Sequence, residues 1–319
     1  MKRRVQGFTL LELLVAVTLT LGMAAVMLAV TTGTLNVWRR SQDRFSTSVQ
    51  AKLALDFLER DLHAGVFRSD AATTWLAVDV TNSSGSLVSR GWQVASLMKP
   101  STGESLNLLP TSDDGRNSPI SNARFGVSGT WLRMISTVAE SGTDGALPRA
   151  VAYQVARRPQ TGAISATNPA EVRYALYRAA VSSSTSFANG NDVTAGYGTA
   201  LSVVNASDAI LSNAVDFGVW LYVQAADGSL RRIFPADAGD ISHAARDSGG
   251  APDANRYPSV ADVMIRVLSE EGARQVAAME QATIARPSNY TSDAEWWWSV
   301  VEANSSVYVR RIELKGGAR

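Results

Sequence analysis

The sequence predicts an α+β protein in which a long amino-terminal, membrane-spanning helix leads into a large β-rich globular domain. Two observations predict the helix: residues 8–30 carry no charge except Glu12, and no proline occurs before Pro100. A third predicts the domain, because several segments beyond residue 66 alternate in polarity or are rich in β-branched residues, which is typical of strands. We therefore expect a transmembrane helix over 8–37, its amphipathic continuation over 38–66, and the globular domain over 67–319.

The apolar segment is long enough to cross a bilayer. Residues 8–30 would extend over about 34 Å as a helix, and the hydrocarbon core of a membrane is about 30 Å thick. A cleavable secretory signal has a shorter apolar core of about 7–15 residues, so cleavage in the alanine-rich stretch 24–29 is the second interpretation. Basic residues at positions 2–4 favour a cytoplasmic amino end. We expect a single-pass protein of the inner membrane with a periplasmic globular domain.

The helical pattern continues beyond the apolar segment. Apolar residues recur there at spacings of three, four or seven, with charged residues between them. Gly65 is a plausible helix cap. We expect one helix to about residue 64, whose outer half lays an apolar stripe against the globular domain. The stripe comprises Trp38, Phe45, Val49, Leu53, Phe57, Leu58, Leu62 and Val66.

The extreme amino end carries a recognisable motif. A basic leader ends in Gly7, Phe8 follows, and an acid stands at Glu12 within an otherwise apolar run. This pattern resembles the class III signal of type IV prepilins and type II secretion pseudopilins, and the pilin-like fold would follow from it. The resemblance implies that a prepilin peptidase cuts between Gly7 and Phe8, that residues 1–7 are a leader peptide, and that Phe8 becomes N-methylphenylalanine. The methyl donor belongs to the peptidase, so we expect no cofactor in this chain.

Glu12 needs a partner in the membrane. A carboxylate within a membrane helix costs roughly 2.5–3.5 kcal/mol, so a simple hydrophobic anchor would not carry one. After cleavage, Phe8 would bear a positive amine, and Glu12 of one subunit could pair with the amine of its neighbour in a filament. The alternative is that Glu12 lies at the headgroup level or pairs with its own terminus. We expect Glu12 to act in assembly.

A second resemblance narrows the family. Residues 58–62, Leu-Glu-Arg-Asp-Leu, resemble the same region of general secretion pathway protein J, a minor pseudopilin. Residues 258–267 and 307–312 resemble its closing strands, although a long insertion separates them here. The prepilin-type proteins of a verrucomicrobial cassette, especially the C member, are also similar.

The domain beyond residue 66 is predicted to be mostly strands. Residues 221–224 and 230–233 are typical of a hairpin around a short loop. Residues 270–285 and 292–303 are helix-like, and 83–89, 100–119, 182–198 and 236–258 are loop-like. The expected strands are 75–80, 130–138, 150–157, 172–181, 215–223, 231–234, 260–267 and 307–314.

The domain carries little recognisable chemistry. The chain has no cysteine and two histidines, and 30 basic residues balance 29 acidic ones, which excludes thiolate sites and gives no footprint for nucleic acid. We expect no catalytic residues and no metal. Adjacent tryptophans Trp296, Trp297 and Trp298 are either core residues or a partner surface. Four aspartates are weak calcium candidates in what we expect to be an ordinary solvated loop: Asp237, Asp240, Asp247 and Asp253.

These expectations converge on a minor pseudopilin of a type II secretion or type IV pilus-like system, assembled into a filament and placed at its tip. Its partners would be the prepilin peptidase, other pseudopilins or pilins, and the inner membrane. One alternative is a minor type IV pilin for adhesion or DNA uptake, in which case nucleic acid becomes a partner. Another is a membrane-tethered periplasmic enzyme or sensor, which the scarcity of histidine disfavours.

Overall fold

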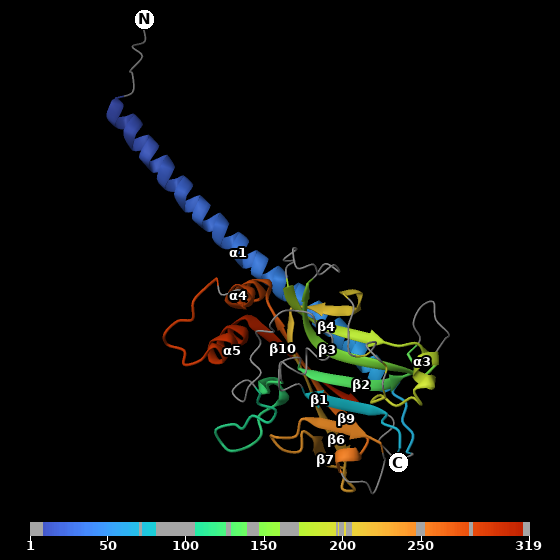
Figure 1. Ribbon diagram of the computed structural model, residues 1–319. Helices are drawn as coiled ribbons and strands as arrows, with labels where there is room; N and C mark the ends of the chain where they lie inside the picture. Colours follow the sequence, from blue (N-terminus) through green and yellow to red (C-terminus); the bar gives the residue numbers. More distant parts are fainter. Residues whose placement is uncertain are drawn as a thin grey trace, which may run out of the picture. The chain divides into compact units, whose positions relative to one another are not determined.

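The structure, a computed structural model, comprises two compact units, residues Met1–Ser48 and Val49–Arg319 (Figure 1). It describes residues 9–69, 72–80, 106–125, 129–138, 147–159, 172–195, 197, 201, 206–246, 253–280 and 283–314.

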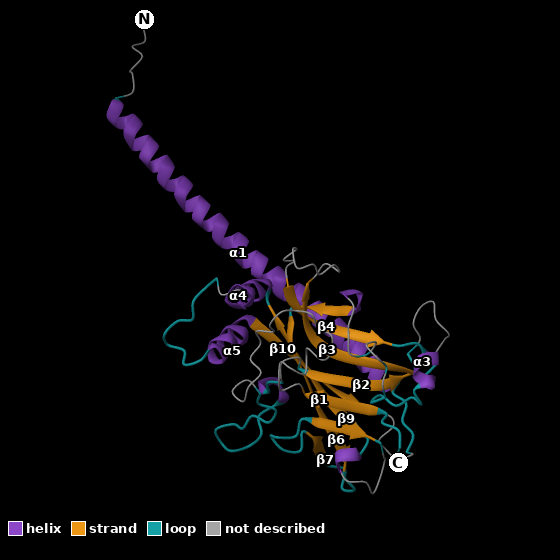
Figure 2. Cartoon of the chain, viewed as in Figure 1, coloured by secondary structure: helices purple, strands orange, loops and turns teal. Residues whose placement is uncertain are grey.

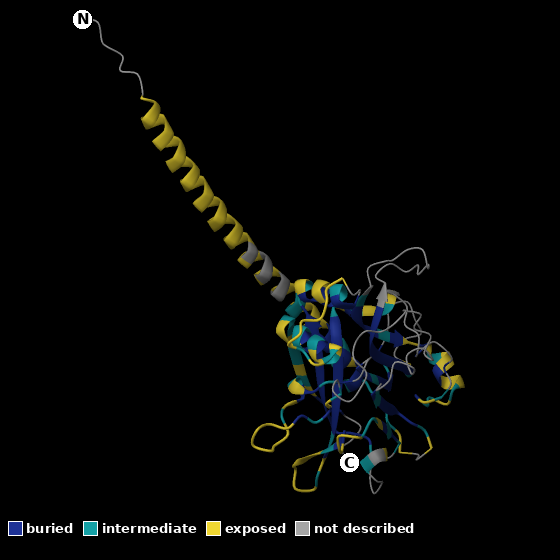
Figure 3. Cartoon of the chain, turned by 60° about the vertical axis from the view of Figure 1, so that its left-hand side comes forward, coloured by how far each residue is buried: buried dark blue, intermediate teal, exposed yellow. Residues whose placement is uncertain are grey.

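Helix α1 (Leu10–His63) is a single helix of 54 residues, as the sequence predicts. It ends where expected, because the Gly65 N–H donates to the carbonyl of Leu62 at 3.1 Å. Within α1, Leu10–Leu35 has a mean hydropathy of 2.5 and is long enough to cross a membrane. Its side chains are exposed (Figure 3). An apolar surface of this length requires lipid or other helices around it.

The second unit contains two antiparallel sheets (Figure 2). The first has strand order β5-β4-β3-β2-β1-β8 and the second has order β10-β9-β6-β7. Strand β6 of the second sheet packs against β3 and β4 of the first. The strands are β1 (Leu76–Val80), β2 (Thr130–Ser136), β3 (Arg149–Pro159), β4 (Val172–Ala180), β5 (Ala209–Ser212), β6 (Ala214–Gln224), β7 (Leu230–Phe234), β8 (Ser242–Ala245), β9 (Val260–Leu268) and β10 (Ser305–Glu313).

Three helices accompany the sheets: α3 (Ser183–Ala188), α4 (Glu270–Glu280) and α5 (Asp293–Asn304). Helices α4 and α5 pack on each other and are inserted between the neighbouring strands β9 and β10. The single-turn helices are η1 (Ile120–Asn122), η2 (Ala206–Asp208) and η3 (Asp253–Asn255).

The eight predicted strands, the β6–β7 hairpin and both later helices are confirmed. The prediction of loops over 182–198 and 236–258 is wrong in part, because α3 and β8 lie in them. Strand β8 has the sequence Ser-His-Ala-Ala, which lacks apolar alternation. It forms because β1 supplies its hydrogen-bonding partners along the register Leu76↔Ala245 to Asp79↔Ser242.

The apolar stripe predicted for α1 is confirmed at Leu58 and Leu62, which are buried, but is wrong toward its amino end. Val49 and Leu53 are about half exposed, at 49% and 52%. A spacing of four residues drifts about 40° around a helix at each step, so the predicted row turns away from the core. Alanines, which allow close approach to a sheet, occupy part of the true buried stripe. That stripe is Ala51, Ala54, Leu55, Leu58 and Leu62.

A buried carboxylate joins α1 to the first sheet. Asp61 is 1% exposed and accepts hydrogen bonds from Nε and Nη2 of Arg178 on β4, at 2.7 and 3.2 Å. It also accepts from the Tyr153 hydroxyl on β3 and from Oγ of Ser136 on β2, the latter at 3.3 Å. Burial, with the nearby Asp61 charge, raises the pKa of Tyr153, which keeps its hydroxyl a donor. One side chain therefore holds three strands against the helix.

We predict that Asp61→Ala lowers the free energy of unfolding by about 3–5 kcal/mol, because it removes the buried carboxylate that Arg178, Tyr153 and Ser136 all contact. Asp56→Ala is the matched control: Asp56 lies on the same helix, is exposed, and pairs with Arg310, which also pairs with Glu59. Its loss should cost less than about 1 kcal/mol. Urea unfolding of the detergent-solubilised full chain, followed by tryptophan fluorescence, measures both. Equal losses would contradict the assigned role of Asp61.

The fold also contains a buried histidine on β8. His243 is 4% exposed, and its Nε2–H donates to the carbonyl of Arg256 at 3.0 Å. Burial lowers its pKa from the ordinary value of 6.5. Below pH 6.5 the unfolded chain therefore binds a proton that the folded chain resists, so the stabilisation present above pH 6.5 is lost as pH falls.

We predict that His243→Gln, which retains an N–H donor for Arg256, loses less stability than the unmodified chain between pH 7 and pH 5. Thermal unfolding at a series of pH values checks this. Identical slopes for the two proteins would show that His243 does not set the acid sensitivity.

Candidate functional site

The predicted processing site lies at the amino end. Gly7 and Phe8 are outside the described residues. The described residues begin at Thr9, directly before α1. Thr9 is hydrogen-bonded to Glu12. The N–H and hydroxyl of Thr9 donate to Oε2 of Glu12 at 2.9 and 3.0 Å. The Glu12 N–H donates back to Oγ1 of Thr9 at 3.3 Å. This is a capping box, and its pattern, Thr-x-x-Glu, was available in the sequence but was missed.

The capping box leaves Glu12 with unused capacity. Both bonds from Thr9 go to Oε2, and Oε1 has no hydrogen-bonding partner within the part of the chain that the structure describes. The side chain is exposed. A carboxylate at a helix amino terminus is favoured by the helix dipole. Glu12 is therefore held in one place while one of its oxygens can accept from a cation.

The other polar side chains of the apolar span are satisfied within it. Each threonine hydroxyl there donates to a backbone carbonyl one turn earlier, at 2.7–3.1 Å. Threonine can lie in an apolar environment at small cost when its hydroxyl is bonded in this way. Among Leu10–Leu35, Glu12 is thus the side chain that calls for an external partner. The threonines are Thr18, Thr20, Thr31, Thr32 and Thr34.

The tryptophan cluster is mainly part of the core. Trp297 and Trp298 on α5 are 3% and 1% exposed, and their rings meet edge to face at 5.0 Å. The Trp297 Nε1–H donates to Oε1 of Glu280 at 3.2 Å, and the Arg124 guanidinium lies 4.9 Å over the Trp298 ring. Trp296 is half-buried. Of the three predicted interface candidates, Trp296 alone keeps appreciable accessible surface.

The aspartates named as weak calcium candidates have local roles. Oδ1 of Asp237 accepts from the Gly239 N–H at 2.8 Å, and Oδ2 of Asp240 accepts from the Ala236 N–H at 3.0 Å. Asp253 pairs with Arg231. Asp247 lies outside the described residues. Among the residues that the structure describes, no three His, Cys, Asp or Glu side chains are placed to hold a metal.

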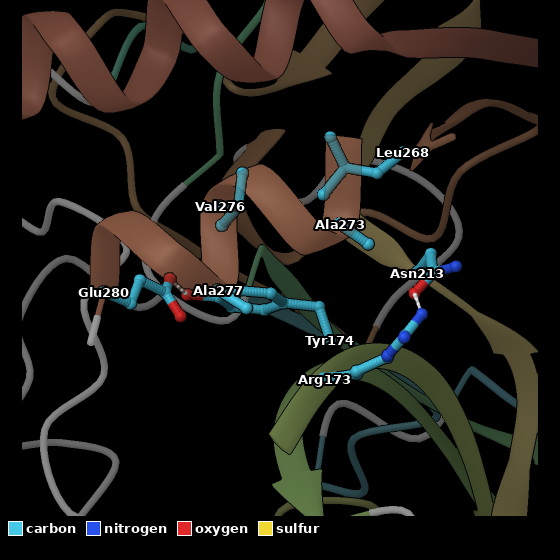
Figure 4. A pocket seen from close by; sticks show the side chains of 8 residues that line it. All are labelled: Arg173, Tyr174, Asn213, Leu268, Ala273, Val276, Ala277 and Glu280. Atoms are coloured by element: carbon cyan, nitrogen blue, oxygen red, sulfur yellow. Dashed lines mark hydrogen bonds between the residues drawn. The ribbon is translucent and has the colours of Figure 1, made fainter. Parts of the chain in front are cut away.

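Helix α4 packs over a small cavity of about 10 Å³ (Figure 4). This volume holds about one water molecule, so it does not suit a cofactor. Buried polar contacts surround it: Glu280 pairs with Arg157 at 2.7 Å and accepts from the Tyr174 hydroxyl at 2.5 Å. Arg173 pairs with Glu270 at 2.5 Å. The cavity therefore belongs to a structural junction that holds the inserted helices on the first sheet.

An open groove of about 560 Å³ lies on the second sheet, and no sequence motif marks it. Arg311 of β10 forms a bidentate pair with Asp262 of β9, with both N–O distances 2.7 Å. Its guanidinium lies over the Tyr222 ring of β6. Burial and the nearby Asp262 raise the pKa of Tyr222 to about 12, so it is neutral at physiological pH. These residues are far apart in the sequence, so only the strand pairing brings them together.

One comparison with known proteins identifies a motif at the amino end. Residues 2–29 match the family model of the prokaryotic N-terminal methylation motif. A comparison with curated protein sequences found no match. Among solved structures, a type IV-like pilin from Thermus thermophilus is similar with a TM-score of 0.34 and 15% identity, covering 85% of this chain and 98% of that chain. That score is too low for function to be transferred. Residues 2–29, which include Gly7, Phe8 and Glu12, are therefore a prokaryotic N-terminal methylation motif.

Proposed function

We propose that this chain is a minor pseudopilin of a type II secretion or type IV pilus-like system. A prepilin peptidase would remove residues 1–7 and methylate Phe8, and the mature chain would join a filament built from other pseudopilins or pilins. The observation that carries this proposal is Glu12. Within a methylation motif, it is fixed at the start of an apolar helix, and one of its oxygens has no partner among the described residues.

The charge balance of the membrane helix supports assembly through Glu12. Cleavage before Phe8 would create a positive amine close to this carboxylate. Each charge is costly in the bilayer, and pairing them relieves both costs. When the amine comes from a neighbouring subunit, the relief is obtained in one axial register only. Glu12 would thus both favour assembly and set the spacing between subunits.

The apolar surface of α1 supports the same function. Its span over Leu10–Leu35 is exposed and long enough to lie in the inner membrane before assembly. Phe45 is 74% exposed in the first unit, and Val49 and Leu53 are about half exposed in the second. Residues 8–37 would form the filament core and 38–66 its continuation, with neighbouring helices covering these side chains. The periplasmic domain, residues 67–319, is bulky, which favours a place at the filament tip.

The proposed function predicts how the amino end is processed. Mass spectrometry of the protein purified from membranes that contain the peptidase should find N-methylphenylalanine, from Phe8, as the first residue. An intact Met1 would contradict the proposal. So would cleavage in the stretch 24–29, which would indicate a secretory signal.

A further prediction separates the two roles of Glu12, which are capping of α1 and charge pairing in the filament. Glu12→Gln keeps an acceptor for the capping box, because glutamine serves there as well as glutamate, but it removes the charge. We expect normal cleavage and incorporation into filaments reduced on the order of tenfold or more, given the cost of an unpaired amine in the membrane. Quantitative immunoblotting of sheared filaments measures incorporation.

Thr9→Val is the matched control, since it removes the capping hydroxyl and keeps the carboxylate. It should be incorporated close to the normal level. If Glu12→Gln assembles normally while Thr9→Val does not, Glu12 acts as a helix cap and the charge pairing is wrong.

A further inference from the structure

Strand β10 forms one edge of the second sheet. Within the described residues it pairs with β9 and with no other strand. The bonds from the Ser269 N–H to the Asn304 carbonyl and from the Leu314 N–H to the Ser259 carbonyl, at 2.9 and 2.8 Å, fix which residues of β10 face β9. In an antiparallel ladder the direction of the backbone groups alternates along the strand. The N–H and carbonyl groups of the even-numbered residues of β10 therefore bond to β9, and those of the odd-numbered residues point away from β9.

The outward groups have no partner in the described structure. The backbone N–H and carbonyl groups of Val307, Val309 and Arg311 make no hydrogen bond to any residue that the structure describes. The residue Val309 is also 46% exposed. An unpaired strand edge is a template for another strand, because only an extended backbone can satisfy alternating donors and acceptors along it.

The other sheet edges differ from β10. Strands β5, β7 and β8 have four or five residues each, and β5 and β7 pair with their neighbours through irregular registers. Short strands and bulges are the usual protection of an edge. Strand β10 has nine residues in an unbroken register with β9. It is the long, regular edge among the described strands.

The two arginines of β10 are paired with carboxylates, so their charges do not protect the edge. Arg311 is neutralised by Asp262, and Arg310 is paired with both Asp56 and Glu59 of α1. The cluster around Arg310 therefore holds two carboxylates for one guanidinium, and Asp56 is 61% exposed. This excess of negative charge favours a basic side chain on the incoming strand beside Arg310.

We propose that β10 is a docking site for an extended segment of a partner protein, which adds to the second sheet as a further strand. The segment carries β-branched residues facing Val307 and Val309 and a lysine or arginine beside Arg310. The side chains of this segment that lie on the same face as Val309 and Arg311 would border the groove that those two residues line. This inference does not rest on entry into a filament.

The test uses the detergent-solubilised full chain and a fluorescent peptide, Val-Thr-Val-Lys-Val-Thr-Val, blocked at both ends. Its valines form one face and its lysine lies on the other. Fluorescence anisotropy should show binding. The same peptide with N-methylated valines cannot donate to the edge and should bind at least tenfold more weakly. Failure of the parent peptide to bind, or equal binding by the methylated one, overturns the proposal.

Two variants locate the site. Val309→Pro removes the outward N–H without breaking a bond to β9, and proline is tolerated at such edge positions. It should abolish peptide binding, whereas Val309→Thr should bind within about twofold of the unmodified chain. Unchanged binding by Val309→Pro overturns the site.

The charge preference and the occupant are tested separately. Replacing the peptide lysine with glutamate should weaken binding to the unmodified chain, and Asp56→Asn should reduce that difference. Sedimentation of the chain alone reports self-pairing. A chain that dimerises through β10, becomes monomeric with Val309→Pro and does not take up the peptide would overturn the assignment to a partner strand.

Discussion

The second unit depends on one buried carboxylate. Asp61 reaches from α1 to β2, β3 and β4, and each of those strands contributes a donor. A carboxylate in this position is stable only while its guanidinium and hydroxyl partners surround it. The close approach of the helix comes from small side chains, since Ala51 and Ala54 are fully buried beside larger leucines. Helix and sheet are thus joined by polar contacts set within close apolar packing.

The same helix carries a second carboxylate in the opposite environment. Glu12 lies where lipid is expected, and its capping box with Thr9 occupies only one of its oxygens within the described residues. Among those residues Asp61 has a full set of partners, whereas Glu12 does not. An incomplete charge in a membrane is resolved by a partner, which is the physical basis for proposing assembly. In the globular unit, the outer edge of β10 likewise has backbone groups without a partner among the described residues.

The sequence predicts the elements better than their packing. The absence of proline and the regular spacing of apolar residues predict α1 to within a few residues of its true end, and alternation predicts eight of the strands. The buried stripe of α1 is predicted at Leu58 and Leu62 but not at its alanines, because alanine is a weak signal of burial. Strand β8 is likewise invisible, since its Ser-His-Ala-Ala sequence depends on β1 for its conformation.

The same distinction applies to the candidate site. Gly7, Phe8 and Glu12 can be predicted from the sequence because they belong to one short motif whose chemistry is local. The groove and the β10 edge cannot be predicted from the sequence, because Arg311, Asp262 and Tyr222 become neighbours only through strand pairing.

The central claim is that the Glu12 carboxylate of this chain pairs with the terminal amine of a neighbouring subunit. Solid-state NMR of filaments assembled from this chain together with its partner pilins tests it directly. This chain carries ¹³C at glutamate carboxyl groups, and the partner pilins carry ¹⁵N. The account predicts a dipolar coupling between the terminal amine of a partner pilin and Glu12, at an ion-pair separation of about 4 Å or less. Absence of this coupling in assembled filaments would contradict it.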